Sequence, residues 1–158
     1  MVKIAPSILS ADFGNLAGEI NAHMPSYVVE RITKALNEHR KPINGSRIGI
    51  LGVAYKKDID DPRESPAFKL MELLQSRGAI LSYNDPFVPR IPRMRRHDLH
   101  MASQELTGEL LERVDCVLLA TDHSQYDYKL IGQHAQLIVD TRNAMVSFPQ
   151  YADNVWKA

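Results

Sequence analysis

One stretch decides the fold of this chain: Arg47-Ile-Gly-Ile-Leu-Gly-Val-Ala-Tyr-Lys-Lys-Asp-Ile-Asp-Asp-Pro-Arg-Glu-Ser-Pro66. It begins as a short apolar strand, Arg47–Leu51, and passes through Gly52 into a charged loop. Ser65 followed by Pro66 is typical of a helix start, because serine caps helices and proline is tolerated in the first turn. Such a junction places backbone N–H groups, lysine and arginine at the carboxyl end of a strand, where open α/β sheets bind phosphorylated ligands. The sequence therefore predicts a ligand site at this strand end.

Strands and helices alternate around this stretch. An earlier helix is expected over Ser26–His39, with Pro25 in its first turn and an apolar stripe between Tyr27 and Leu36. Alternation of this kind favours right-handed crossovers and a parallel sheet with both faces covered, that is, an α/β fold. We expect the order 3-2-1-4-5 or close to it, with the site at the carboxyl ends of strands one, three and four. The remaining predicted elements are strands at Ala79–Tyr83, Cys116–Ala120 and Leu137–Val139, helices at Pro66–Arg77, Ser103–Arg113 and Ser124–His134, and a tail after Met145 without a clear pattern.

Composition narrows the classes of function. The 158 residues, 44% of them hydrophobic, suit one domain with a packed core, and 19 basic residues balance 19 acidic ones. A zero net charge gives no field to steer nucleic acid or an anionic membrane, and the basic run Arg90–Arg96 is interpreted as a solvated loop. No apolar run is long enough to span a membrane, and a signal peptide is not expected. A single cysteine, Cys116, excludes an internal disulfide and favours a cytoplasmic location.

Two features of the decisive stretch could contact a nucleotide. Gly49 and Gly52 give Gly-x-x-Gly-x-Ala, which is not the dinucleotide fingerprint Gly-x-Gly-x-x-Gly, so a strand-end glycine allowing close packing is an equal reading. Lys56, just past the strand end beside Tyr55, could reach a phosphate as a point charge. Taken alone, a solvated surface lysine would be the commoner explanation.

Other polar residues leave open alternatives. Asp85 ends a strand where nucleotide folds place an acid for ribose hydroxyls, but Asp85 before a proline is equally a turn former. Asp122-His123 could act at a site or could cap the following helix. Cys116 lies in mid-strand without a basic neighbour and is interpreted as a structural thiol. His97 and His100 have no partners at zinc-ligand spacing, so no metal site is expected.

Several ordered motifs together resemble one family. Gly-x-Ala-Tyr-Lys-x-Asp-x-x-Asp-x-Arg-x-Ser-Pro, ending at Pro66, is similar to the C-terminal domain of the UDP-glucose/GDP-mannose dehydrogenase family, the NAD-dependent UDP-sugar 6-dehydrogenases. Matching segments before and after it extend the resemblance over about residues 17–146: Glu19–Val29, Ser82–Pro86, Ala120–His123 and Val139–Asn143. The resemblance implies a Rossmann-like domain at 45–146, preceded by the end of a central connecting helix at 17–44 and followed by a tail at 147–158.

The resemblance also implies roles for particular residues. Tyr55 and Lys56 would contact UDP or a UDP-sugar, Arg142 would reach toward the UDP-sugar, often across the subunit boundary of a homodimer, and Arg63 would face NAD held by another domain. The family's catalytic cysteine and NAD fingerprint belong to regions outside this match, and these residues contain neither. We therefore expect no catalytic residue here, and a domain that is inactive alone.

The first residues resemble something else. Residues 2–13 are similar to the opening of ribulose-phosphate 3-epimerase, a (β/α) barrel enzyme, and we interpret residues 1–16 as a graft that begins with a short foreign strand. A barrel needs about 250 residues, and no segments matching its catalytic motifs follow. An epimerase-related chain is thus one alternative. A ligand-free dimerisation fragment is another, in which the apolar face of the helix at 27–36 would be exposed and would favour self-association.

Overall fold

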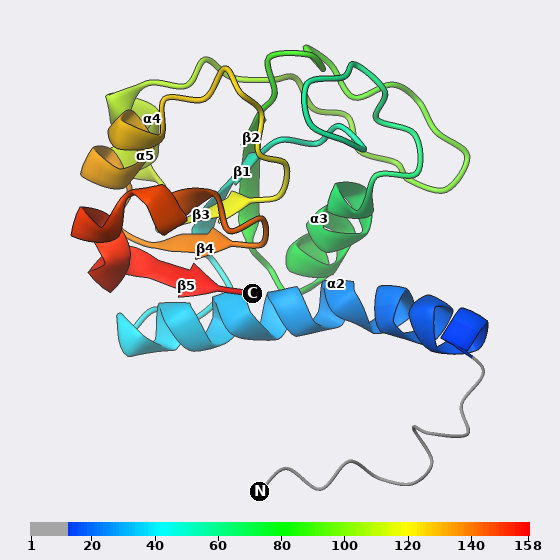
Figure 1. The fold of residues 1–158 in the computed structure, drawn as a ribbon, viewed down its shortest axis with the longest axis horizontal. Helices are drawn as coiled ribbons and strands as arrows, with labels where there is room; N and C mark the ends of the chain where they lie inside the picture. The colour runs from blue at the N-terminus through cyan, green and yellow to red at the C-terminus, as the bar shows by residue number, and fades with distance from the viewer. Residues whose placement is uncertain (1–12) are drawn as a thin grey trace, which may run out of the picture.

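The computed structural model describes residues 13–158, and the side chains from residue 22 onward. A five-stranded, fully parallel sheet forms the centre, with helices on both faces (Figure 1). The predicted α/β, Rossmann-like class is confirmed. The elements are α2 (Phe13–Glu38), β1 (Arg47–Leu51), α3 (Pro66–Ser76), β2 (Ile80–Asn84), α4 (Gly108–Arg113), β3 (Cys116–Leu119), α5 (Tyr128–His134), β4 (Ile138–Asp140), the 3-10 turns η1 (Ala144–Ser147) and η2 (Pro149–Asn154), and β5 (Val155–Lys157).

The strand order is β2-β1-β3-β4-β5, so the expected 3-2-1-4-5 is wrong in detail. The chain leaves β1 through α3 and returns on one side as β2, then crosses to the other side of β1 as β3. As a result, β1 and β3 are neighbours whose following helices, α3 and α5, cover opposite faces of the sheet (Figure 1). Such a switch point opens a crevice at the carboxyl ends of the strands, which is where open α/β sheets bind ligands.

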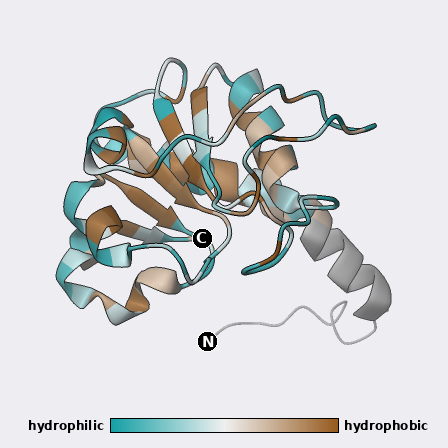
Figure 2. Cartoon of the chain, turned by 90° about the horizontal axis from the view of Figure 1, so that it is seen from above, coloured by the Kyte–Doolittle hydropathy of each residue, from teal (hydrophilic) through white to brown (hydrophobic). Residues whose placement is uncertain are grey.

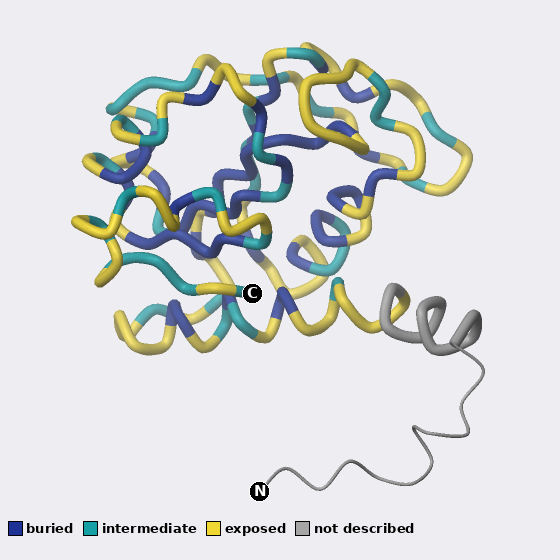
Figure 3. The backbone as a smooth tube through the Cα atoms, in the orientation of Figure 1, coloured by how far each residue is buried: buried dark blue, intermediate teal, exposed yellow. Residues whose placement is uncertain are grey.

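Alternate side chains of the central strands enter two hydrophobic cores. In β3, Cys116 and Leu118 pack with residues of α2 and α3, whereas Val117 and Leu119 pack with residues of α4 and α5. All four side chains are buried because helices cover both faces, so the strand is an unbroken apolar run. Figures 2 and 3 show the hydrophobic, buried strands between the more polar outer helices.

The first helix is longer than the sequence indicated. α2 begins at Phe13 and continues through Pro25, which was expected to start the helix. A proline inside a helix costs about 3 kcal/mol, so tertiary packing must offset it. One face of α2 is buried within the same chain, against α3 and the sheet. This face is formed by Val28, Val29, Ile32, Ala35 and Leu36. The expectation that this apolar face is exposed is therefore wrong, whereas self-association of the chain stays a prediction.

Two helices start later than predicted because other side chains cap them. Thr107 caps α4 and Asp127 caps α5, each accepting hydrogen bonds from backbone N–H groups of the first turn. The predicted first residues of these two helices bind elsewhere. Ser103 exchanges hydrogen bonds with the backbone of Asp85, and Ser124 donates to Asp58. The predicted Ser65 cap of α3 is confirmed, since its hydroxyl accepts from the Ala67 N–H at 3.3 Å.

The tail contains structure that the sequence did not reveal. Residues 155–157 form β5, which extends the sheet beyond β4 at its edge. Trp156 lies under the guanidinium of Arg31 from α2, 5.0 Å from its ring centroid, and the side-chain Nε of Arg31 donates to the carbonyl of Lys157. The tail therefore closes the edge of the sheet onto α2.

Candidate functional site

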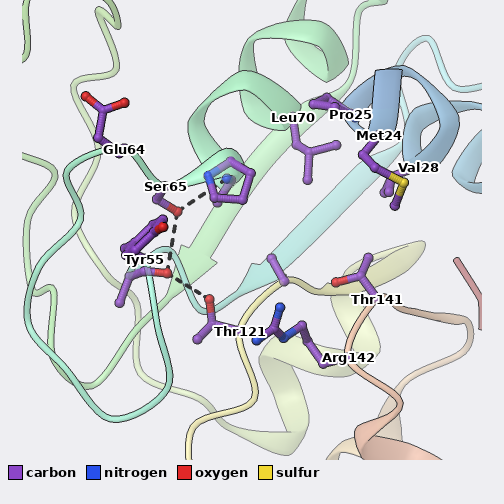
Figure 4. Close-up of a pocket in the computed structure, with 14 residues that line it drawn as sticks. Met24, Pro25, Val28, Tyr55, Glu64, Ser65, Leu70, Thr121, Thr141 and Arg142 are labelled. Atoms are coloured by element: carbon purple, nitrogen blue, oxygen red, sulfur yellow. Dashed lines mark hydrogen bonds between the residues drawn. The ribbon is translucent and has the colours of Figure 1, made fainter. Parts of the chain in front are cut away.

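A cavity of about 590 Å³ opens at the carboxyl ends of β1, β3 and β4, the edge where the sequence predicted a ligand site (Figure 4). The first turn of α3 forms one wall, and side chains of α2 form an apolar wall. The volume falls in the range typical of small-molecule sites. The lining residues are Met24, Pro25, Val28, Ala54, Tyr55, Glu64, Ser65, Pro66, Ala67, Leu70, Ala120, Thr121, Thr141 and Arg142.

The floor of the cavity is a close approach between the ends of β1 and β3. Gly52 has φ +83°, and a Cβ there would lie 2.4 Å from Cβ of Thr121, so no larger residue fits without a shift. The Thr121 hydroxyl donates to the carbonyl of Ala54 at 2.9 Å, and the Ser65 hydroxyl donates to the same oxygen at 3.4 Å. The two hydroxyls join β3 and the start of α3 to the strand end of β1 (Figure 4). The glycine that the sequence singled out thus packs against a loop rather than a helix.

Tyr55 and Lys56 follow directly at the mouth of the cavity. Tyr55 lines the cavity with a half-exposed ring, and its backbone N–H donates to the carbonyl of Asp61 at 2.8 Å. The ammonium of Lys56 lies 5.5 Å from the Tyr55 ring centroid, so the two side chains associate. Lys56 is exposed and does not line the cavity, but its neighbour Tyr55 does.

Arg142 reaches the same cavity from the end of β4. Its guanidinium Nε donates to Asp122 Oδ1 at 3.3 Å, and its side chain stays 47% exposed. Lys57 is the second cation near this carboxylate, 3.9 Å from Asp122 Oδ2. The turn that carries Arg142 is fixed by buried Asp140, which accepts from the backbone N–H groups of Arg142 and Met145. Arg142 and Tyr55, predicted from distant parts of the sequence, are thus brought to one cavity.

Arg63 lies apart from this cavity. Its guanidinium makes two hydrogen bonds to Asp61, at 2.9 Å each, and its side chain is 80% exposed. The hydrogen bond from Arg63 lowers the pKa of the Asp61 carboxyl. Arg63 is therefore exposed and paired with Asp61, and it is not one of the residues that line the cavity.

Asp85 and His123 form a buried polar pair beneath the loop that follows β1, and this pair organises more of the structure than the sequence indicated. His123 Nε2 lies 3.0 Å from Asp85 Oδ2, and both side chains are fully buried. Asp85 also accepts the backbone N–H groups of Val53, Ala54 and Phe87 at 2.7, 2.9 and 2.8 Å. Burial acts to raise the pKa of Asp85, but these hydrogen bonds outweigh it and the pKa lies below the ordinary value. Of the alternatives left open, Asp85 organises the turn and the loop, and His123 faces the protein interior.

The remaining candidates are structural. Cys116 is buried, and burial raises the pKa of its thiol to about 12, which agrees with the interpretation of an inert thiol. His97 and His100 contact the carboxylates of Glu72 and Asp98. Among residues 13–158, no group of three His, Cys, Asp or Glu side chains is placed to hold a metal ion, and no described helix is both long and apolar enough to cross a membrane.

Comparison with known proteins shows which family has this architecture. A family model described as the UDP-glucose/GDP-mannose dehydrogenase family, UDP binding domain, matches residues 49–147. The chain belongs to this family. The matched residues contain the last three residues of β1, all of β2 to β4, and every lining residue of the carboxyl-edge cavity except those from α2. The predicted resemblance of the main body of the chain is therefore confirmed.

Individual dehydrogenases of the family match most of the chain. The UDP-N-acetyl-D-mannosamine dehydrogenase of Methanococcus maripaludis is 30% identical over 156 residues, covering 94% of this chain and 33% of that protein. The solved structure of the UDP-D-ManNAc dehydrogenase of Pyrococcus horikoshii is 28% identical with a TM-score of 0.66, covering 85% of this chain and 31% of the other. The solved structure of a dehydrogenase from Methanosarcina mazei shares the fold with a TM-score of 0.74 and is 23% identical in sequence. The match covers 100% of this chain and 32% of that protein.

The chain spans about a third of the length of the curated relatives it matches. The epimerase-like resemblance and the foreign strand fall mainly on residues 1–12, outside the described residues, and stay predictions. Residues 13–16, which the predicted graft includes, belong to α2.

Proposed function

We propose that this domain binds the UDP part of a nucleotide sugar in the carboxyl-edge cavity, as one part of an NAD-dependent UDP-sugar 6-dehydrogenase. One observation carries the proposal: Tyr55, Arg142 and the first turn of α3 converge on a single cavity at the switch point of the sheet. A diphosphate needs cations and backbone dipoles, and a uridine needs a flat, partly apolar wall. The cavity offers each of these.

The chemistry of the walls matches a nucleoside diphosphate. Arg142 presents a planar fork of donors to a phosphate, and the N-terminus of α3 favours negative charge. Lys56, next to Tyr55, adds a point charge. The Tyr55 ring and the apolar side chains of Met24 and Leu70 supply surface for a base or ribose. Arg142, which pairs with Asp122 in the free domain, would exchange this carboxylate for the phosphates.

A calorimetric titration with UDP tests the proposal. Arg142→Ala and Lys56→Ala should each weaken UDP binding by about 1–3 kcal/mol, the range of charge-assisted hydrogen bonds. Lys129→Ala removes an exposed lysine away from the cavity and serves as the matched control. Uridine without phosphates should be less affected than UDP by both variants. Equal UDP affinity in all four proteins would overturn the assignment.

We further propose that this chain alone does not bind NAD tightly. The stretch Gly-x-x-Gly-x-Ala stands in place of a dinucleotide fingerprint, and Arg63 is an exposed side chain paired with Asp61. Arg63 fits a single contact to NAD bound elsewhere in the larger enzyme. In this proposal NAD supplies the oxidant for the sugar alcohol, and the present domain holds and orients the nucleotide. Alone it binds without oxidising.

Three further predictions accompany this proposal. A homodimer is implied by the resemblance, a cytoplasmic location by the single buried cysteine, and a graft by residues 1–16. The mass of the particle in solution, measured by light scattering with and without UDP, tests the homodimer. A mass of one chain under both conditions would contradict it.

A further inference from the structure

The loop that carries Tyr55 and Lys56 is bound by buried side chains on both sides of these two residues. At its start, the N–H groups of Val53 and Ala54 donate to Asp85 Oδ2. Further along, the N–H of Asp58 donates to His123 Nδ1 at 2.9 Å. Between the two anchors lies an exposed tip, residues 55–57, which holds both predicted UDP contacts of this loop.

His123 joins the two anchors into one unit. A backbone N–H can only donate, so His123 Nδ1 is the acceptor, and Nε2 carries the ring proton and donates it to Asp85. The ring is held between Phe87 and Tyr126, with centroid distances of 4.9 and 5.5 Å. Both ring nitrogens are therefore used, and the ring has no room to turn.

Asp58 requires this support because its backbone is in an unfavourable region. Its φ is +58°, in the left-handed region that residues with a Cβ seldom adopt. Such a conformation persists where several contacts determine it. Here the N–H is bound by His123, and the carboxylate accepts from the N–H and hydroxyl of Ser124 at 2.7 and 2.6 Å.

We propose that His123 is a positioning residue for nucleotide binding: by bridging Asp85 and the Asp58 N–H, it holds Tyr55 and Lys56 in the conformation that meets the ligand. The inference rests on the proposed function and adds a residue that itself faces away from the cavity. Because the tip is already ordered in the free protein, ligand binding does not carry the free-energy cost of ordering the loop. Without the bridge, the tip would sample other conformations and UDP would bind more weakly.

Two substitutions test the two hydrogen bonds of the His123 ring separately, because each removes one bond and keeps the other. The amide nitrogen of His123→Gln can occupy the place of Nε2 and donate to Asp85, but leaves the Asp58 N–H without its acceptor. The amide oxygen of His123→Asn can occupy the place of Nδ1 and accept from Asp58, but loses the bond to Asp85. If the bridge to Asp58 positions the tip, His123→Gln should weaken UDP binding roughly tenfold, the equivalent of one hydrogen bond, and His123→Asn should weaken it less.

Amide hydrogen exchange supplies a readout that a general loss of stability would not reproduce. In His123→Gln, exchange at the Asp58 amide should accelerate roughly tenfold relative to the Leu118 amide in the core. Leu111→Ala, which changes a buried side chain in the core formed with α4 and α5, is the control for lowered stability. It should leave both this ratio and the UDP affinity unchanged while most molecules remain folded. In the unsubstituted protein, ring ¹⁵N spectra should place the proton on Nε2.

The outcomes are distinct. A proton on Nδ1, equal UDP affinities for His123→Gln and His123→Asn, or an unchanged Asp58 exchange ratio in His123→Gln would each overturn the positioning role. Absence of UDP binding in the unsubstituted protein would overturn the proposed function and the positioning role together. In that case accelerated Asp58 exchange in His123→Gln would leave the bridge as a feature of the fold alone.

Discussion

Two long loops leave neighbouring strands at the carboxyl edge of the sheet, and they are held in opposite ways. The loop at 53–64 after β1 has no buried side chain beyond Ala54, and polar groups beneath it bind its backbone. The loop at 86–106 after β2 instead sends apolar side chains into the core: Val88, Ile91 and Leu99. Figure 3 shows exposed stretches alternating with buried ones along these connections.

The difference explains how each loop can be used. Hydrophobic burial stabilises the second loop but points its side chains inward. Hydrogen bonds to the backbone hold the first loop while Tyr55 and Lys56 stay exposed, so these two side chains can face a ligand. A loop held by few buried polar groups is also sensitive to the loss of any one of them, because the unpaired partners stay buried.

The largest effect is expected from removing the group that anchors the first loop. Asp85→Ala leaves the buried N–H groups of Val53 and Ala54 and the Nε2–H of His123 without an acceptor. The free energy of unfolding, measured with urea, should fall by about 3–5 kcal/mol. Asp98→Ala, an exposed aspartate of the second loop, is the matched control and should change it by less than about 0.5 kcal/mol. A small effect of Asp85→Ala would contradict the polar anchoring.

The pH dependence sharpens the same test. The pKa of Asp85 is lower in the folded protein than its ordinary value of 3.8. Its ionised form therefore adds stability above pH 3.8, and that contribution is lost as the pH falls through the folded pKa. The difference in stability between the unsubstituted protein and Asp85→Asn should shrink as the pH drops from 5 toward and below 3.8. A constant difference across this range would show that the charge of Asp85 is unimportant.

In the second loop, the loss of a buried apolar side chain should lower stability, whereas the loss of an exposed charge should not. Leu99→Ala removes a buried side chain and should lower the free energy of unfolding by about 2–3 kcal/mol, toward the low end for buried leucines. UDP affinity should stay unchanged, because Leu99 does not line the carboxyl-edge cavity. Val146→Ala, at an exposed apolar side chain, controls for loss of methyl groups. Weaker UDP binding in Leu99→Ala would show that the two loops are coupled.

Sequence reasoning located what depends on local pattern. The apolar runs of β1 and β3, the Ser65–Pro66 helix start and a cavity at the carboxyl edge were predictable from the sequence pattern, whereas Arg142 was named only through the family resemblance. Features decided by distant contacts were missed. α2 continues through Pro25 because a tertiary face is buried, and β5 is three residues long and exists through pairing with β4.

The buried His123 shows the same limit inside the site. The motif Asp122-His123 marked a strand end, but nothing in the sequence places Asp58 and Asp85 on either side of one imidazole, since these residues are separated by 65 and 38 positions. The one available signal was that polar motifs follow three of the predicted strands, because the carboxyl ends of parallel strands meet at one edge of the sheet. Ser103 and Ser124, the predicted first residues of two helices, belong instead to the same group of loop contacts.

The smallest effect is expected at an exposed arginine of the first loop. Arg63→Ala removes the exposed pair with Asp61, which is screened by water, and should change UDP affinity by less than about twofold. The backbone contact that orders the loop here joins the Tyr55 N–H to the Asp61 carbonyl and does not need the guanidinium. Calorimetry with UDP beside Arg142→Ala makes the comparison, since each variant removes one arginine. A loss at Arg63 as large as that at Arg142 would place both arginines at the nucleotide, whereas an unchanged affinity leaves Arg63 available for a contact outside the carboxyl-edge cavity.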